Sequence, residues 1–169
     1  MNSTFVRVDN RLVHGQIIEG WVPHLKVSVI VVVNDEVAGD FFRESVIRMS
    51  VPSDIEVQIY GVDDFARHRW TEYSRGRVTI VLFRDFADAV RAYDGGFRFG
   101  RLNIGNVHKE SGKTCISASL FLDHKDLKLL QKLVAGGVDV EIQSIPRDKP
   151  SKLCDAVKKI PFSSAVLER

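Results

Sequence analysis

The chain is organised around one stretch near its N-terminus, Arg7-Val8-Asp9-Asn10-Arg11-Leu12-Val13-His14-Gly15-Gln16. The stretch lies where an apolar run that is typical of a strand, residues 4–8, gives way to a run with helical spacing that includes Ile17, Ile18 and Trp21. Open α/β sheets bind ligands beyond the carboxyl ends of their strands. A junction that carries a histidine, arginines, an aspartate and a glycine at this place is therefore a candidate functional site.

His14 is the candidate catalytic residue of this junction. Histidine has an unperturbed pKa of about 6.5, so a large fraction of such side chains is neutral near pH 7. A neutral ring nitrogen can attack phosphorus without a separate base. Arg11 lies three residues away in the same loop, and its forked donors suit phosphoryl oxygens. We predict that His14 becomes phosphorylated and that Arg11 holds the phosphoryl group.

Gly15 and Gln16 begin the helix that is predicted to follow His14. Glycine lets another group approach the backbone closely, and the start of a helix offers unpaired N–H donors and a partial positive charge. Gly15 is therefore predicted to bind phosphate, with Gln16 in a supporting role. Phosphoryl transfer depends mostly on positioning and on charge stabilisation, so we expect neither a cofactor nor a metal.

Asp9 and Arg7 are assigned more cautiously from the residues alone. Asp9 is itself an anion, so we predict that it braces Arg7, Arg11 or the loop backbone instead of binding phosphate. Arg7 alternates with Val6 and Val8 in the predicted strand. Two interpretations of Arg7 stay open, a direct phosphate contact and a structural role.

Length and composition limit the class of protein. A chain of 169 residues with 27% charged and 44% hydrophobic residues fits one soluble globular domain, residues 1–169. The net charge of +2 is too small to argue for nucleic acid, and no apolar run approaches the roughly 20 residues of a membrane-spanning helix. No secretory signal pattern is present at the N-terminus, so we expect a cytoplasmic protein. Cys115 and Cys154 lack C-x-x-C spacing, and core packing is the expectation for both.

Strand-like and helix-like segments alternate along the chain. The predicted strands are residues 4–8, 27–33, 56–60, 78–83, 101–104, 114–122 (a strand or an extended run) and 138–142. The predicted helices are a segment after His14 that ends near Pro23, and residues 36–49, 63–70, 86–93, a segment capped by Asp123 that ends at Gly136, and 150–159. This alternation predicts an α/β fold with a single open, mostly parallel twisted sheet and helices on both faces. The right-handed crossover rule then places His14 on one rim of the sheet.

Two other patterns fail as functional motifs. Residues 105–114 resemble a P-loop, but Val107 stands where that motif needs glycine. The basic stretch Arg67-His68-Arg69-Trp70, with Arg75 and Arg77, is typical of a solvated turn in a chain that is nearly neutral. We therefore expect neither nucleotide nor nucleic acid as a partner.

The run from Arg7 to Gln16, followed by Trp21, resembles the signature of the mannose/fructose/sorbose family of enzyme IIB components of the bacterial sugar phosphotransferase system. The family pattern is roughly R-I/V-D-D/N-R-L-I/V-H-G-Q, and each position of the run fits it. Three later segments agree with the resemblance, namely residues 34–38, 102–106 and 137–143 with Pro146. The chain departs from many relatives at Asn34 and Asn106, where we expect tuning and not loss of function.

The resemblance implies a role in a phosphoryl relay. In the family the histidine receives a phosphoryl group on Nδ1 from a phosphohistidine of an enzyme IIA partner. The group then passes to a sugar held by the membrane components IIC and IID, so the protein would be peripheral and not membrane-spanning. A regulatory phosphocarrier or a binding module without sugar transport is the alternative. The sequence is compatible with a homo-oligomer but does not define the oligomeric state.

Three apolar residues near His14, namely Leu12, Val13 and Trp21, are candidates for a docking surface. Trp21 has helical spacing, and we favour a core position for it. His108 follows a predicted strand end and could face the same rim. The other histidines lack surroundings that suggest chemistry.

Overall fold

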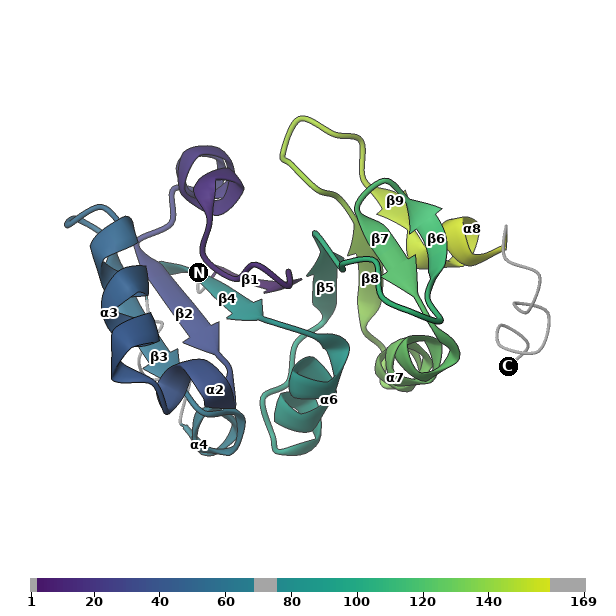
Figure 1. Cartoon of the computed structure of the whole chain (residues 1–169), viewed down its shortest axis with the longest axis horizontal. Coiled ribbons are helices and arrows are strands. Elements are labelled where there is room, and N and C mark those ends of the chain that lie inside the picture. The colour runs from purple at the N-terminus through teal and green to yellow at the C-terminus, as the bar shows by residue number, and fades with distance from the viewer. Residues whose placement is uncertain (1–2, 69–75, 159–169) are drawn as a thin grey trace.

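The computed structural model describes residues 3–68 and 76–158. Its main feature is a sheet of seven strands in the order β3-β2-β4-β1-β5-β8-β9. The strands are β1 (Ser3–Val8), β2 (Val29–Val33), β3 (Glu56–Tyr60), β4 (Val78–Phe83), β5 (Arg101–Ile104), β8 (Asp139–Ile142) and β9 (Ser151–Lys152). All neighbouring pairs are parallel except β8 and β9 (Figure 1). The predicted open, mostly parallel α/β sheet is confirmed.

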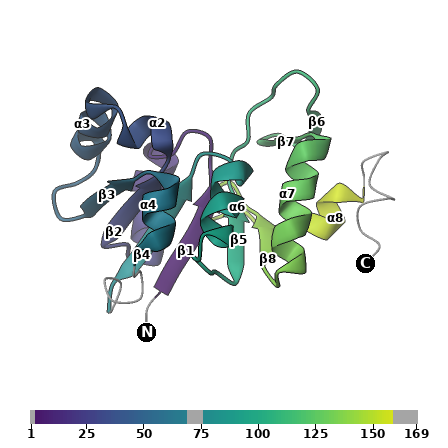
Figure 2. The same cartoon turned by 90° about the horizontal axis from the view of Figure 1, so that it is seen from below.

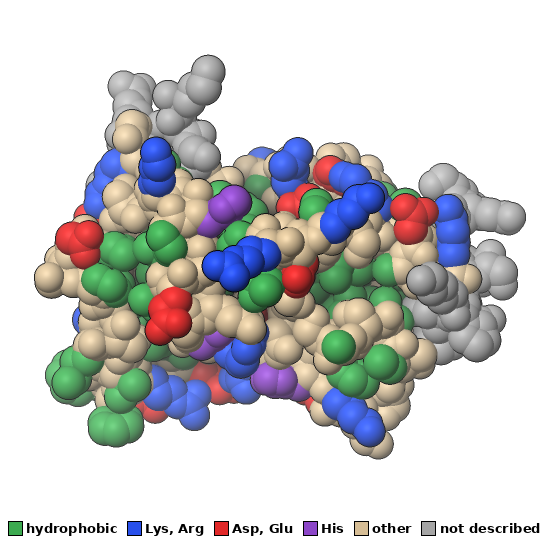
Figure 3. Space-filling view, turned by 90° about the horizontal axis from the view of Figure 1, so that it is seen from above, with side chains coloured by type: hydrophobic (Ala, Val, Ile, Leu, Met, Phe, Trp, Pro, Cys, Tyr) green, Lys and Arg blue, Asp and Glu red, His purple; other side chains and the backbone are tan. Residues whose placement is uncertain are grey.

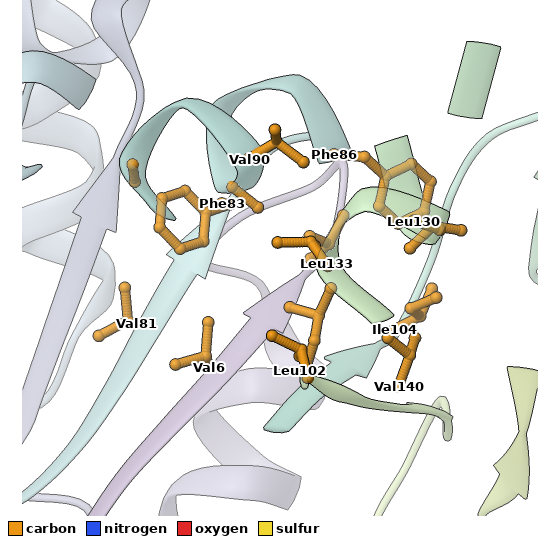
Figure 4. Close-up of a cluster of buried hydrophobic side chains, with 14 of the residues drawn as sticks. Val6, Val81, Phe83, Phe86, Val90, Leu102, Ile104, Leu130, Leu133 and Val140 are labelled. Atoms are coloured by element: carbon orange, nitrogen blue, oxygen red, sulfur yellow. The ribbon is translucent and has the colours of Figure 1, made fainter. Parts of the chain in front are cut away.

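Three helices cover one face of the sheet, which we call the α6 face. They are α4 (Val62–Arg67), α6 (Phe86–Asp94) and α7 (His124–Ala135), and Figure 2 shows them side by side in front of the strands. Figure 4 shows Val6, Val81 and Phe83 of the strands in the same core as Val90 of α6 and Leu133 of α7. Because apolar area removed from water contributes about 25 cal/mol per Å², this continuous cluster is the main stabilising layer of the molecule.

The opposite face, which we call the η1 face, is covered by a second set of helices. They are the π-helix η1 (Gln16–Trp21), α1 (Val22–Leu25) and α3 (Phe41–Ser50). Ile17 and Trp21 of η1 are buried against strand residues that include Ile80 and Leu82 of β4. Strand β2 is buried at every position, which explains its run of valines and isoleucine, since a parallel strand is covered on both faces.

Two predicted helix boundaries were wrong. The helix predicted over 36–49 is interrupted, because α2 (Asp35–Ala38) ends at Gly39 and Asp40 caps the separate helix α3. The Asp40 carboxylate accepts hydrogen bonds from the N–H groups of Phe42 and Arg43, as expected of an N-cap residue. The helix after His14 does not end near Pro23, since Pro23 lies in the first turn of α1, where a missing N–H costs nothing.

The segment 114–122 is not one strand. It forms a hairpin of β6 (Thr114–Ser117) and β7 (Leu120–Leu122), which make a separate antiparallel pair. The segment 150–159 begins with strand β9 before the short helix α8 (Leu153–Val157). The predicted ends of two helices, 69–70 and 159, lie outside the described residues, as do Arg69, Trp70 and Arg75 of the basic stretch.

Some burial predictions also failed. Cys115 and Cys154 are exposed and not in the core. Helix α3 has no buried residue, and its apolar side chains Phe41, Phe42, Val46 and Met49 are exposed. Figure 3 shows hydrophobic side chains gathered at the lower left, over this helix. Helical spacing predicted the helix correctly but did not reveal that much of its apolar stripe faces solvent.

The connections of three neighbouring strands place the β1 loop at a switch point of the sheet. The chain leaves β1 toward η1 on one face, whereas it leaves β4 and β5 toward α6 and α7 on the other face. The loops after β1 and after its two neighbours therefore diverge at the carboxyl ends of the strands. Such a divergence opens the crevice in which α/β sheets bind ligands.

Candidate functional site

The loop from Asp9 to Gly15 is held in a tight, partly strained conformation. The N–H of Leu12 donates to the carbonyl of Asp9 at 2.9 Å. Leu12 has a φ of 56°, a left-handed conformation that costs a non-glycine residue of the order of 1–3 kcal/mol. Its side chain is buried in the cluster beneath η1, which anchors the loop. Arg11 and His14 flank this anchor in the sequence.

Asn10 connects the loop to both neighbouring strand ends. Its Nδ2 donates to the carbonyl of Arg84 at 2.7 Å, after β4. Its Oδ1 accepts the N–H of His108, after β5, and its own N–H donates to the carbonyl of Asn106 at 2.9 Å. The loop is therefore tied to β4 and β5 at the switch point. His108 lies on this rim and is exposed, and it meets the β1 loop through its backbone.

Asp9 lies at the centre of the site with no exposed surface. Its Oδ2 is 3.0 Å from Arg7 Nη2, 3.3 Å from Arg11 Nη2 and 3.1 Å from His14 Nε2. Its Oδ1 accepts from the backbone N–H and from Nε of Arg11, each at 3.2 Å. The predicted bracing role of Asp9 is therefore what the structure shows, and both arginines and the loop backbone share it.

Burial alone would raise the pKa of the Asp9 carboxyl group. Hydrogen bonds from His14 and Arg11, together with the charge of Arg7, outweigh burial and lower this pKa to about 2. Asp9 is therefore ionised at neutral pH, beneath the imidazole. An ionised carboxylate accepts hydrogen bonds only, so a neutral His14 must carry its proton on Nε2.

His14 reaches solvent with 15% of its side chain exposed. Among the contacts of the described residues, none involves Nδ1 of its ring, which leaves that nitrogen free with its lone pair. A Cβ at Gly15, the residue after His14, would meet no atom within 4 Å, so the backbone that follows the histidine borders open space. One ring nitrogen of His14 is thus held by Asp9, and the other has no partner among the described residues.

Arg11 stands beside His14 with 34% of its side chain exposed. In addition to Asp9, its Nη2 donates to Oε1 of Gln16 at 2.9 Å, which gives Gln16 the supporting contact predicted for it. No acceptor among the described residues occupies Arg11 Nη1. A positively charged donor is thus available at the surface, next to the imidazole.

Of the two interpretations of Arg7, the structure supports the structural role and not a direct phosphate contact. Its side chain is fully buried in the interior and is enclosed by acceptors of the protein itself. A guanidinium group in this position does not reach a phosphoryl group above His14. The apolar docking candidates divide in a similar way, because Leu12 and Trp21 are buried and only Val13 is partly exposed. The core position of Trp21 is confirmed.

Several residues of the site escaped sequence reasoning. They are Asn10, Asn103, Gly105 and the backbone of Gln143 and Ser144. All of them stand near the carboxyl ends of β1, β5 and β8, which are adjacent in the sheet. Only the order of the strands in the sheet would have identified these residues, and a single sequence does not give that order.

Two hollows border the loop. One, of about 380 Å³, is lined by Gly15 and Gln16 on one side and by Pro146 and Arg147 on the other. The second, of about 470 Å³, lies toward the α6 face and includes Asn10, Arg84 and Asp88. Figure 3 shows histidine side chains among lysines and arginines along the lower edge of the molecule. The rim has room for a partner to approach the loop.

These features define an open α/β domain with a histidine at the switch point of the sheet and a buried carboxylate in contact with its ring. The sequence model of the PTS system sorbose subfamily IIB component matches residues 3–166. The chain therefore belongs to this family, as the resemblance of its N-terminal stretch indicated.

Individual relatives agree with this assignment. The chain is 30% identical to the mannose-specific EIIAB component of Escherichia coli over 154 residues, which cover 91% of the chain and 48% of that protein. It is 29% identical to the sorbose-specific EIIB component of Lacticaseibacillus casei, with 95% and 98% covered. The crystal structure of manxB from Thermoanaerobacter tengcongensis superposes with a TM-score of 0.83 at 31% identity, covering 94% and 98%. The chain spans about half the length of the mannose-specific relatives that it matches.

Within residues 3–68 and 76–158, no helix is long and apolar enough to cross a membrane.

Proposed function

We propose that this protein is a phosphocarrier of the sugar phosphotransferase system in which His14 carries the phosphoryl group. The group arrives from a phosphohistidine of an enzyme IIA partner and leaves toward a sugar held by membrane components IIC and IID. The observation that carries the proposal is the contact between Asp9 Oδ2 and His14 Nε2, 3.1 Å apart. This contact occupies Nε2 and leaves Nδ1 as the ring nitrogen available to react.

The transfer step follows from the protonation state of the ring. Nδ1 forms a bond to phosphorus, while the bond between phosphorus and the donor's imidazole nitrogen breaks and that nitrogen keeps the electron pair. The proton on Nε2 of His14 stays in place, so the phosphorylated ring carries a positive charge. Asp9, ionised and buried, stabilises that charge through the hydrogen bond it already accepts. In onward transfer the oxygen of a sugar hydroxyl forms a bond to phosphorus, and the bond between phosphorus and Nδ1 breaks with the electron pair kept by Nδ1. The hydroxyl proton passes to a base beside the sugar on the membrane components.

Arg11 is assigned the phosphoryl oxygens in this proposal. Its position is fixed by Asp9 and Gln16, and its unoccupied Nη1 supplies a donor whose charge matches the group in transit. Phosphoryl transfer needs such preorganised positive charge more than it needs covalent chemistry from the protein. Gly15 keeps the space beside the imidazole clear for the donor.

The partners must share one surface, because donor and acceptor react at the same nitrogen. The β1 loop and the two hollows beside it form that surface in the proposal, and docking must be transient so that each partner can leave. The mannose-specific and sorbose-specific relatives are named for different sugars. The proposal therefore assigns no sugar to this chain, and it places the protein on the cytoplasmic side, at the membrane components.

Transfer of labelled phosphate from a phosphorylated enzyme IIA protein of this family tests the proposal. The wild-type chain is expected to become labelled, and His14→Ala is expected to remain unlabelled while its circular dichroism spectrum is unchanged. His108→Ala is the matched control, because His108 is exposed on the same rim, and it should accept label at the wild-type rate. Label on folded His14→Ala would show that the phosphorylated residue is another one.

A further inference from the structure

Arg7 is a charge in a place where an apolar residue would be expected. It lies in the middle strand of the sheet, between β4 and β5, and its side chain has no exposed surface. Removing a guanidinium group from water costs several kcal/mol unless it is paired and hydrogen-bonded. A residue of this kind needs an explanation beyond packing.

Both terminal nitrogens of the guanidinium group donate to two acceptors each. Nη2 donates to Asp9 Oδ2 at 3.0 Å and to the carbonyl of Ser144 at 2.9 Å. Nη1 donates to the carbonyl of Gln143 at 2.8 Å and to Oδ1 of Asn103. The acceptors thus come from the ends of β1 and β8 and from within β5, so the group is fixed against three strands.

Two further features shape the cavity around this group. Arg7 Cζ lies 5.0 Å from the centroid of the Trp21 ring, a cation–π distance, and Trp21 Nε1 donates to the same Ser144 carbonyl at 3.2 Å. A Cβ at Gly105 would overlap Nη2 and Cζ of Arg7. Gly105 is therefore required to leave room for the guanidinium group.

A single carboxylate oxygen of Asp9 connects Arg7 to His14. Asp9 Oδ2 accepts from Arg7 Nη2 at 3.0 Å and is 3.1 Å from His14 Nε2. Any displacement of the guanidinium group moves the oxygen on which the imidazole rests. Arg7 itself is too deeply buried to touch a phosphoryl group or a partner.

We propose that Arg7 is a positioning residue for phosphoryl transfer: held by β5, β8 and Trp21, it fixes Asp9 and through Asp9 the orientation of His14. The inference rests on the function proposed above and goes beyond it, because it assigns a kinetic role to a residue that contacts no substrate. It also explains why the residue is arginine. Lysine has a single nitrogen with three donors and no planar fork. It therefore lacks the two separate nitrogens with which Arg7 donates to Asp9 and to Gln143.

The contact with a buried carboxylate gives the proposal a spectroscopic signature. The proton on Nε2 of His14 should exchange slowly with water, because its acceptor has no exposed surface, and should give a separate downfield signal in a 1H–15N NMR spectrum. In Arg7→Lys this signal is expected to disappear, and single-turnover transfer per folded molecule is expected to fall at least tenfold. A residue that only supported folding would change neither quantity in the folded fraction.

Gly105→Ala provides a second test in which Arg7, Asp9 and His14 are not themselves substituted. The added methyl group displaces the guanidinium group, so the NMR signal and the transfer rate should fall as they do in Arg7→Lys. Gly100→Ala is the matched control, since Gly100 precedes the same strand and a Cβ there meets nothing within 4 Å. Its spectrum and rate should be those of the wild type.

The outcomes separate the inference from the proposed function. Loss of the NMR signal and of rate in folded Arg7→Lys and Gly105→Ala, with Gly100→Ala normal, supports the positioning role. Wild-type rates in both folded variants would overturn it and leave the phosphocarrier proposal standing. Retained labelling of His14→Ala would overturn the phosphocarrier proposal, and the inference with it.

Discussion

One row of side chains across the sheet divides into two unlike halves. In register on the η1 face, the row reads Ile59 of β3, Val32 of β2 and Leu82 of β4, and then continues as Arg7 of β1, Asn103 of β5 and Glu141 of β8. The apolar half packs beneath η1 and α3. The polar half lies beneath the segment that follows β8, which supplies the carbonyls of Gln143 and Ser144.

The two halves differ in what stabilises them. An apolar row is stabilised by burial alone and tolerates changes that conserve volume. The polar row is stable only while its charged groups keep their partners, because a buried charge that loses its partner is costly. Arg7 Nε already lacks a hydrogen-bond partner among the described residues. The change from one kind to the other occurs at β1, the strand that bears His14 at its end.

Asp9→Asn should have the largest effect, because Asp9 is the counter-ion of Arg7 in the polar half. The variant leaves the buried Arg7 without its counter-ion and should lose about 3–5 kcal/mol of unfolding free energy. Transfer to His14 should also fall at least about a hundredfold, since the positive charge of the phosphorylated ring is no longer stabilised. Urea unfolding and single-turnover labelling measure the two effects.

Low pH should mimic this substitution in the wild type. The folded state lowers the pKa of Asp9 from 3.8 to about 2, so the stabilisation is complete above about pH 4 and is lost as the pH falls toward 2. Leu82→Ala is the control in the apolar half, next to Arg7 in the row. It should cost about 2–5 kcal/mol without changing the transfer rate per folded molecule. Slow transfer in folded Leu82→Ala would show that the two halves are not functionally distinct.

The parts of the fold that depend on local pattern could be predicted from the sequence. The apolar run of β2 indicated a strand covered on both faces, and the spacing of leucines in α7 indicated a helix with one buried side. The hairpin of β6 and β7 and the break before α3 were missed, because each depends on a turn of one or two residues inside an otherwise regular pattern. The exposed apolar side chains of α3 were missed because periodicity identifies a stripe but not what covers it.

The site could be predicted only where its residues are neighbours in sequence. His14, Arg11, Asp9 and Gln16 lie within eight residues, and the structure brings them into contact. The burial of Arg7 depends on Asn103, Gly105 and Ser144, which are about one hundred residues away or more. These partners come together because β1, β5 and β8 are adjacent, and strand order cannot be deduced from the periodicity of a single chain.

Asp88→Asn extends the comparison to helix α6 on the other face of the sheet, with a smaller effect of opposite sign. Burial, with a smaller contribution from the negative charges of Asp85 and Asp35, raises the pKa of Asp88 to about 6. It outweighs the hydrogen bond from Asn34 Nδ2 at 2.9 Å and the charge of Arg91, which lower this pKa. The folded state therefore loses stability as the pH rises from about 4 to 6. Asparagine removes this loss, and the variant should be more stable than the wild type by about 1 kcal/mol at pH 7.5, after allowance for solvent screening.

Urea unfolding of Asp88→Asn at pH 4 and at pH 7.5 checks this prediction. The difference from the wild type should shrink toward zero at the lower pH, where Asp88 is protonated in both folded and unfolded states. An equal difference at both pH values would mean that the carboxyl group titrates normally. In that case the fold would not shift the pKa values of Asp88 and Asp9 in opposite directions.

Arg11→Ala should change stability least, and it separates the two arginines of the loop. Arg11 is partly exposed, and its buried partner Asp9 keeps its contacts with Arg7 and His14, so the unfolding free energy should change by no more than about 0.5–1 kcal/mol. Transfer should slow by about tenfold to a hundredfold, because a donor to the phosphoryl oxygens is lost. Arg43→Ala is the control, since Arg43 pairs with two carboxylates on the exposed surface of α3 and should leave transfer unchanged. If Arg11→Ala is as unstable as Asp9→Asn, Arg11 belongs to the buried polar half and contributes to the stability of the fold. If Arg11→Ala is stable but transfers phosphate slowly, Arg7 positions the site and Arg11 acts on the phosphoryl group.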